Sequence, residues 1–228
     1  MCPVTAPPRT PTGPRLYDLV AILFVSFLLV SNIAATKLIG VHVGAAFLVF
    51  DGGAVLFPLT YVLGDVMSEV YGFARARRAI LAGFAVSIIA SLAFWLVQAA
   101  PPGPGYENQD AFAAVLGFVP RIVAASLGGY LVGQLLNSRV LVWIKERFGA
   151  ERLWVRLIGS TVVGEAADTV IFCTIAFYGI VTGAAFANYV LTGYVYKVGL
   201  EVVLLPVTYR VIAWVRRREA VAIQEAVA

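Results

Sequence analysis

Eight charged side chains lie inside stretches of sequence that are otherwise apolar enough to span a membrane. Five are acidic and three are basic: Asp65, Glu69, Glu165, Asp168, Glu201, Lys37, Arg121 and Lys197. An ionised group at the centre of a bilayer costs about 2.5–3.5 kcal/mol even on the scale derived from helix insertion. We therefore expect these groups to face a protein interior or a water-filled cavity, where they pair with one another or bind a polar ligand.

The segment around residue 65 combines aromatic and acidic side chains. Tyr61, Asp65 and Glu69 follow one another at intervals of four residues, which places them on one face of a helix. Two carboxylates one turn apart repel each other when both are ionised, so one is expected to take up a proton or to bind a cation or a hydrogen-bond donor. Asp65 lies nearer the middle of the span and is the stronger candidate. Glu69 has an alternative, which is an ion pair with the basic residues 75–78.

A second acidic pair lies in a later apolar segment, where Glu165 and Asp168 stand three residues apart and Phe172 follows one turn later. With three bases for five acids, two carboxylates remain even if every base pairs with an acid. A carboxylate without a partner in a low-dielectric surrounding favours its protonated form. We therefore hypothesise that Glu69 or Glu165 makes cargo binding or transport depend on pH. The alternative is that both are simply hydrated in an open cavity.

The last apolar segment and several single residues complete the predicted site. Lys197 and Glu201 have the i, i+4 spacing of a local salt bridge, which is the alternative to a role in binding. The substrate-binding residues that we predict are Asn32, Tyr61, Asp65, Glu69, Arg121, Gln134, Asp168, Phe172, Tyr194, Lys197 and Glu201. Glu165 belongs to the same acidic pattern, but its role is left open.

The composition is that of an integral membrane protein. Of 228 residues, 61% are hydrophobic and 13% are charged, with a mean hydropathy of +0.88, whereas a soluble domain has about 25% charged residues. A spanning helix requires about 20 apolar residues. We predict an all-α membrane protein with six transmembrane helices, at about residues 16–39, 53–73, 78–98, 112–138, 153–179 and 188–214. Residues 43–51 are apolar but too few to span, and are expected to form an extended or re-entrant connection.

The predicted helices belong to one integral membrane domain, at residues 16–216, between two cytoplasmic tails. Residues 1–15 contain five prolines and are expected to form a disordered tail. The apolar run behind them is too long for the core of a signal peptide. Residues 217–228 form the second tail.

The positions of Lys and Arg predict the orientation of the chain. Basic residues lie before the first predicted span, between the second and third, between the fourth and fifth, and after the sixth. The other connections lack them, apart from Arg121 inside a span. By the positive-inside rule, both termini are expected in the cytoplasm. The net charge of +4 is explained by these orientation signals and by attraction to anionic lipid, without a nucleic-acid partner.

Residues typical of catalytic or cofactor sites are sparse. Cys2 and Cys173 lie far apart, so we expect neither a disulfide nor a metal cluster. His42 is the only histidine and is expected to lie alone in a loop. The sequence contains no Gly-rich phosphate loop, so any use of ATP would require a partner protein. We expect no cofactor, metal or catalytic residue, although an aspartyl pair such as Asp65 with Asp168 leaves an intramembrane enzyme as an alternative.

The two halves of the chain are similar in outline. The middle helix of each predicted three-helix half carries two acids one turn apart, and the second half would be inverted relative to the first. This arrangement is typical of inverted repeats around a binding site at the membrane midplane. Gly129 and Gly133 have the spacing that lets two helices approach closely, which predicts a packing contact.

Four parts of the sequence carry a resemblance to a known family. They are Ser31-Asn32-Ile-Ala-Ala-Thr-Lys37, Pro58-Leu-Thr-Tyr-Val-Leu-Gly-Asp-Val-Met-Ser-Glu-Val-Tyr-Gly72, Gly159-Ser160 followed by Asp168-Thr-Val-Ile-Phe172, and Tyr196-Lys197 followed by Glu201 and Pro206. Through them the chain from Leu16 to about Arg216 resembles the queuosine precursor transporter family, earlier labelled a "putative vitamin uptake" family. The block from Pro58 to Gly72 is the most specific part.

The resemblance implies a bacterial inner-membrane importer of 7-deazaguanine precursors of the tRNA base queuosine. The cargoes would be 7-cyano-7-deazaguanine and 7-aminomethyl-7-deazaguanine. A buried carboxylate can accept hydrogen bonds from the ring N–H and the exocyclic amine of such a compound. The carbonyl of the cargo would accept a hydrogen bond from a donor such as Asn32, Lys197 or Arg121. The residue types alone would equally suit an amino acid or a vitamin.

Three interpretations of the function remain open at this point. The first is a self-sufficient transporter, working by facilitated diffusion or by ion coupling. The second is a substrate-binding membrane subunit of an ATP-driven vitamin importer, and the third is an intramembrane enzyme. We expect a transporter rather than an enzyme, embedded in the lipid bilayer, and a homodimer is one of the assemblies that the sequence allows.

Overall fold

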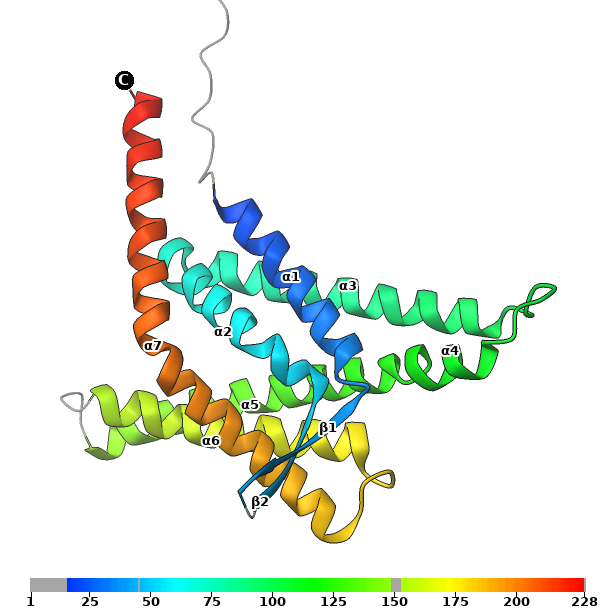
Figure 1. Ribbon diagram of the computed structural model, residues 1–228. Coiled ribbons are helices and arrows are strands. Elements are labelled where there is room, and N and C mark those ends of the chain that lie inside the picture. Colours follow the sequence, from blue (N-terminus) through cyan, green and yellow to red (C-terminus); the bar gives the residue numbers. More distant parts are fainter. Residues whose placement is uncertain (1–15, 45, 149–152, 228) are drawn as a thin grey trace, which may run out of the picture.

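The computed structural model describes residues 16–44, 46–148 and 153–227 of the chain. The predicted N-terminal tail, residues 1–15, lies outside the described residues. The elements are, in order, α1 (Tyr17–Ala34), β1 (Leu38–Val43), β2 (Ala46–Asp51), a 3-10 turn η1 (Gly52–Val55), α2 (Phe57–Val66), a π-helical turn η2 (Met67–Tyr71), α3 (Phe73–Ala99), α4 (Gln109–Leu116), α5 (Val119–Phe148), α6 (Leu153–Phe177) and α7 (Gly183–Val227) (Figure 1).

The structure confirms a predominantly helical membrane fold. Among the described residues, five helical stretches are long and apolar enough to cross a membrane: Tyr17–Ala34, Phe73–Ala99, Gln109–Ile144, Gly159–Phe177 and Gly183–Ala220. The remaining predicted span corresponds to α2 and η2. These two elements cover residues 57–71, which rise about 22 Å at 1.5 Å per residue, less than a bilayer core of about 30 Å. The six-span count therefore stays a prediction.

A β-hairpin replaces the end of the first predicted helix. Helix α1 ends at Ala34 rather than at residue 39, and strands β1 and β2 pair antiparallel, with Leu38 opposite Asp51. The strands are rich in β-branched and aromatic residues, which favour extended structure. Residues 46–51 are thus extended, one of the two predicted forms of this connection. His42, expected in a loop, lies in β1.

The hairpin is fixed to α7 by one side chain. Asn188 accepts a hydrogen bond from the Val49 amide at 3.1 Å and donates one to the Phe47 carbonyl at 2.8 Å. Because these are backbone groups of β2, the outer edge of the hairpin is bound to a helix rather than left open. Figure 1 shows the hairpin lying across the lower part of α7.

Helices α5 and α6 pack closely along glycine, as the spacing of Gly129 and Gly133 predicted. A Cβ atom on Gly129 would lie 2.9 Å from the Asp168 carbonyl, and one on Gly133 would lie 3.0 Å from the Gly164 carbonyl. A Cβ on Gly164 would in turn lie 2.9 Å from Cβ of Asn137. Larger residues would therefore push the helices apart. This contact fixes the positions of the polar residues on α6.

Two apolar clusters lie at different levels of the molecule. The first joins α1, α2, α3 and α7 through buried residues such as Phe24, Met67 and Ile212. The second joins α5, α6 and α7 through Ile122, Phe177 and others, together with Ala35 at the end of α1. Phe172 on α6 packs against the second cluster.

The C-terminal part of α7 is a continuous helix. The helix contains Pro206, and it changes direction partway along its length, as expected of an internal proline (Figure 1). Beyond residue 216, where a tail was predicted, Glu219 is buried and accepts hydrogen bonds from the Leu16 amide and the Tyr71 hydroxyl, both at 2.8 Å. The first residues of the tail segment therefore pack against α1 and η2.

Candidate functional site

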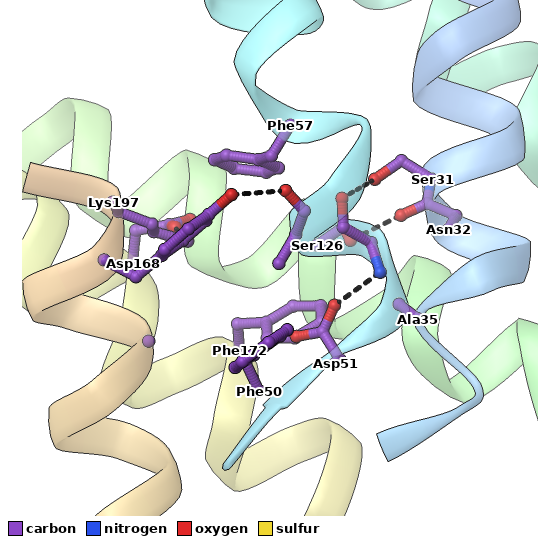
Figure 2. Close-up of a pocket in the computed structure, with 14 residues that line it drawn as sticks. Ser31, Asn32, Ala35, Phe50, Asp51, Phe57, Ser126, Asp168, Phe172 and Lys197 are labelled. Carbon is purple, nitrogen blue, oxygen red and sulfur yellow. Dashed lines mark hydrogen bonds and ion pairs between the residues drawn. The ribbon is translucent and has the colours of Figure 1, made fainter. Parts of the chain in front are cut away.

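A polar cavity lies where α1, the end of the hairpin, α2, α5, α6 and α7 meet. Its volume is about 80 Å³. Four of the predicted site residues line it: Asn32, Asp168, Phe172 and Lys197. They come from α1 near the start of the chain and from α6 and α7 near its end, and Figure 2 shows their side chains around one space.

An ion pair between α6 and α7 forms one wall of the cavity. Lys197 Nζ lies 2.5 Å from Asp168 Oδ2, and the two side chains are 14% and 20% exposed. The ammonium also lies over the rings of Phe57 and Phe172, at 4.7 and 5.9 Å from their centroids. Such contacts stabilise a desolvated cation. The alternative of a local salt bridge between Lys197 and Glu201 is therefore wrong.

Asp51 places a second carboxylate at the cavity, and the sequence analysis did not include it. Its Oδ1 accepts a hydrogen bond from the Gly53 amide at 2.9 Å, and its Oδ2 accepts one from the buried Tyr189 hydroxyl at 2.8 Å. Burial raises the pKa of Asp51, while the Tyr189 hydrogen bond and the charge of Lys197 act in the opposite direction. The available signal was an acid directly followed by Gly52 and Gly53, which let the chain turn closely beside α1.

The opposite wall consists of small polar side chains. The Ser126 hydroxyl on α5 donates to Asn32 Oδ1 at 2.8 Å, and Asn32 Nδ2 donates to Ser87 Oγ at 3.4 Å. Ser31 donates to the Gly53 carbonyl at 3.2 Å. Asn32 is 4% exposed, so its amide is held in one orientation by neighbours on α3 and α5. Ser31 and Ser126 line the cavity without having been predicted.

Aromatic rings close the remaining side. Phe50 and Tyr196 line the cavity, and their rings are nearly parallel, with centroids 6.1 Å apart and planes inclined by 5°. The Tyr196 hydroxyl donates to the Ala54 carbonyl at 2.8 Å. Tyr194, which was predicted, is not among the lining residues, and its hydroxyl lies 3.4 Å from the Val162 carbonyl on α6. The tyrosine of α7 that lines the cavity is therefore Tyr196, two residues after the predicted Tyr194.

A smaller cavity of about 60 Å³ lies between α5 and α6. Gln134, Asn137, Glu165 and Asp168 are among its lining residues, so Asp168 borders both cavities. Tyr61 on α2 reaches this region, because its hydroxyl donates to Glu165 Oε1 at 2.8 Å. The predicted residues Tyr61 and Gln134 thus belong to the surroundings of the smaller cavity.

The other predicted residues have different surroundings. Arg121 donates to the carbonyls of Ile175 and Tyr178, at 2.6 and 2.7 Å, and so binds the C-terminal end of α6. Asp65 is exposed. Glu69 is also exposed and forms an ion pair with Arg216 at 3.2 Å, rather than with residues 75–78. Glu201 is partly buried, and its charge interacts with those of Glu165 and Asp65.

The larger cavity therefore combines three kinds of group. Asp51 and Asp168 supply carboxylate acceptors, while Lys197 and the amide of Asn32 supply donors. The rings of Phe50, Phe57, Phe172 and Tyr196 supply flat apolar surfaces. A ligand that fits all three would be planar, with hydrogen-bond donors along one edge and an acceptor elsewhere.

Comparison with known proteins gives consistent matches. The family described as "Putative vitamin uptake transporter" matches residues 51–211. The chain is 31% identical to a protein of Bacillus subtilis named "Probable queuosine precursor transporter", over 69% of each chain. It is 32% identical to the "Queuosine precursor transporter" of Escherichia coli, over 55% of this chain and 54% of the other. No solved structure matches the chain.

Proposed function

The chain belongs to the "putative vitamin uptake transporter" family, and on that premise we propose that it imports 7-deazaguanine precursors of queuosine across the bacterial inner membrane. The names of the two relatives support this cargo class. The structural observation that carries the proposal is the partly buried Asp168–Lys197 pair at a cavity, with the Lys197 ammonium over the rings of Phe57 and Phe172.

The chemistry of the cavity suits both proposed cargoes, 7-cyano-7-deazaguanine and 7-aminomethyl-7-deazaguanine. In our proposal, Asp168 accepts hydrogen bonds from the ring N–H and the exocyclic amine, and Phe172 stacks on the ring. Lys197 or Asn32 donates to the carbonyl. Hydrogen bonds with an ionised partner are stronger than neutral ones. A site of this kind discriminates against analogues that leave its buried polar groups unpaired.

The substituent at position 7 of the ring provides a further distinction. Asp51, Asp168 and Lys197 give the larger cavity one excess negative charge when all three are ionised. A protonated aminomethyl group would balance that charge, whereas a cyano group would not. We therefore expect the aminomethyl compound to bind more tightly, and Asp51→Asn to reduce this preference by about tenfold, the size of one hydrogen bond to a charged group.

Uptake by the purified protein in sealed vesicles tests the proposal. We expect vesicles that contain the protein, with no ATP present, to take up both compounds unchanged, as measured by mass spectrometry. Excess guanine should compete more effectively than an unrelated vitamin such as riboflavin. Uptake that requires an added ATPase would favour the ATP-driven importer, and a chemically altered product would favour an enzyme. The absence of any uptake or binding of the two compounds would contradict the proposed cargo.

The proposed orientation places both termini in the cytoplasm, as the alternation of basic connections predicts. A reporter protein fused after Arg218 should be active only when it is cytoplasmic. A reporter inserted near Gly105, in the connection between α3 and α4, should be active only outside the cell. The reverse pair of results would contradict this topology.

A further inference from the structure

Two buried oxygen atoms at the smaller cavity have no hydrogen-bond partner among the residues that the structure describes. They are Oδ1 of Asn137 on α5 and Oε2 of Glu165 on α6, and both residues line the cavity. Burying a polar atom without a partner is unfavourable, because the atom loses its hydrogen bonds to water. Because both atoms are acceptors, neither can satisfy the other. A group that carries positive charge or donates hydrogen bonds would satisfy both.

The charges around Glu165 also favour a positively charged ligand. Tyr61 on α2 donates to Glu165 Oε1 at 2.8 Å, and Lys197 on α7 forms its ion pair with Asp168. Tyr130 on α5 lines the cavity but carries no charge, and Glu201 on α7 adds a further negative charge. Glu165, Asp168 and Lys197 therefore sum to one negative charge when all three are ionised, and Glu201 can only increase it. Because Asp168 and Lys197 balance each other, one monovalent cation would neutralise the charge of Glu165.

We propose that the smaller cavity binds a single monovalent cation, either a proton or Na⁺, between Glu165 and Asn137, and that this cation is coupled to transport. A proton on Glu165 Oε2 would turn that atom into a donor for Asn137 Oδ1. Na⁺ would instead be coordinated by both oxygens, since oxygen atoms are its usual ligands. Either ion satisfies the two acceptors and balances the charge of Glu165.

Asp168 provides the physical link between the cation and the cargo. It borders both cavities, and its carboxylate holds Lys197 in the larger one. The negative charge of Glu165 attracts the Lys197 ammonium, and a bound cation would remove this attraction. The electrostatic potential that Lys197 presents to the cargo would therefore depend on whether the cation is bound. Thermodynamic linkage requires the effect to be reciprocal, so that cargo binding also changes the affinity for the cation.

Transport driven by ion gradients in vesicles tests the coupling, which rests on the proposed cargo. In wild-type vesicles, an inward gradient of either H⁺ or Na⁺ should accumulate 7-aminomethyl-7-deazaguanine above its external concentration, and which gradient works identifies the ion. In Glu165→Gln, the gradient should have no effect, while exchange of cargo between the two sides continues. Gln keeps an acceptor for Tyr61 and provides an amide donor for Asn137, and so imitates the cation-loaded state.

The matched control is Glu146→Gln, the same change at an exposed position of α5, which should accumulate cargo as wild type does. The proposal is overturned if neither gradient drives accumulation while exchange proceeds, or if Glu165→Gln still responds to the gradient. A protein that neither exchanges nor binds the cargo would instead contradict the proposed function.

A binding measurement on the purified protein is independent of accumulation. Cargo affinity should change with pH between 5 and 9, or with Na⁺ against choline, and Asn137→Ala should weaken the apparent cation affinity by about tenfold. A cargo affinity in the wild type that is insensitive to both pH and Na⁺ would overturn the proposal, even if Glu165→Gln does not fold.

Discussion

The acidic pair near the end of α2 and the acidic pair of α6 have similar spacing and opposite surroundings. Asp65 and Glu69 are exposed, and Glu69 pairs with Arg216 at the surface. Asp168 pairs with a largely buried lysine, and Glu165 accepts a hydrogen bond from Tyr61. The same local pattern thus gives a surface pair on one helix and the border of two cavities on the other.

The difference arises from which residues each helix buries. Next to Asp65, Val66 and Met67 are fully buried in the apolar cluster shared with α1 and α7, so this contact faces away from the acids. Helix α6 packs against α5 along Gly129 and Gly133, and Asp168 lies directly in that contact. The spacing of the acids thus defines a shared helix face, whereas the packing of neighbouring residues decides what that face contacts.

The largest expected effect is that of Asp168→Asn. The substitution leaves the buried ammonium of Lys197 without its carboxylate, and breaking a buried pair costs about 3–5 kcal/mol, which corresponds to a loss of about 100-fold or more. We expect uptake of the deazaguanine compounds to fall by at least that factor. The amount of folded protein should be checked by size-exclusion chromatography, and full uptake would remove Asp168 from the site.

Replacing the other partner of the pair should have a somewhat smaller effect. In Lys197→Met, Asp168 can still lose its charge by taking up a proton, so the cost is smaller. We expect uptake to fall by about 30-fold, which corresponds to the value of about 1.5–3 kcal/mol for one hydrogen bond to a charged group. In the double variant Asp168→Asn/Lys197→Met, the two losses should be clearly less than additive. Additive losses would show that the two residues act independently.

Asp65→Asn tests whether the acids near the end of α2 take part in transport. Because Asp65 is exposed and its charge interacts mainly with Glu69 and Glu201, we expect a loss of uptake of about tenfold or less, the size of one hydrogen bond. Measured under the same conditions, this loss should be at least tenfold smaller than that of Asp168→Asn. Equal losses would place the α2 acids on the transport path and break the comparison.

The smallest effect is expected for Glu69→Gln. Its ion pair with Arg216 is exposed, and such pairs contribute about 0–1 kcal/mol, which corresponds to less than about fivefold in uptake. The pH profile of uptake should match that of the wild type, in contrast to Glu165→Gln. A changed profile in Glu69→Gln alone would transfer the predicted pH dependence to the α2 pair.

The sequence predicted four of the residues that meet at the larger cavity. Asn32, Asp168, Phe172 and Lys197 were identified because polar and aromatic residues within apolar spans have few alternatives to an interior position. Asp51 and Phe50 were missed because they belong to a connection too short to span, and only the hairpin brings them beside α7. Tyr196 was passed over for Tyr194, since the rotation of α7 depends on its neighbours and not on its own sequence.

The class of the protein could be predicted from the sequence alone: its hydropathy and its small number of charges indicate helices in a bilayer, because backbone groups there must be satisfied within each segment. The spacing of Gly129 and Gly133 also predicted a close helix contact, because glycine lets two helix backbones approach each other. Only the tertiary structure decided which charges pair. Lys197 pairs with Asp168 on α6 and not with Glu201, one turn away on its own helix. Contacts of the ammonium with α6 and with the rings of Phe57 and Phe172 outweigh the short distance to Glu201 along the chain.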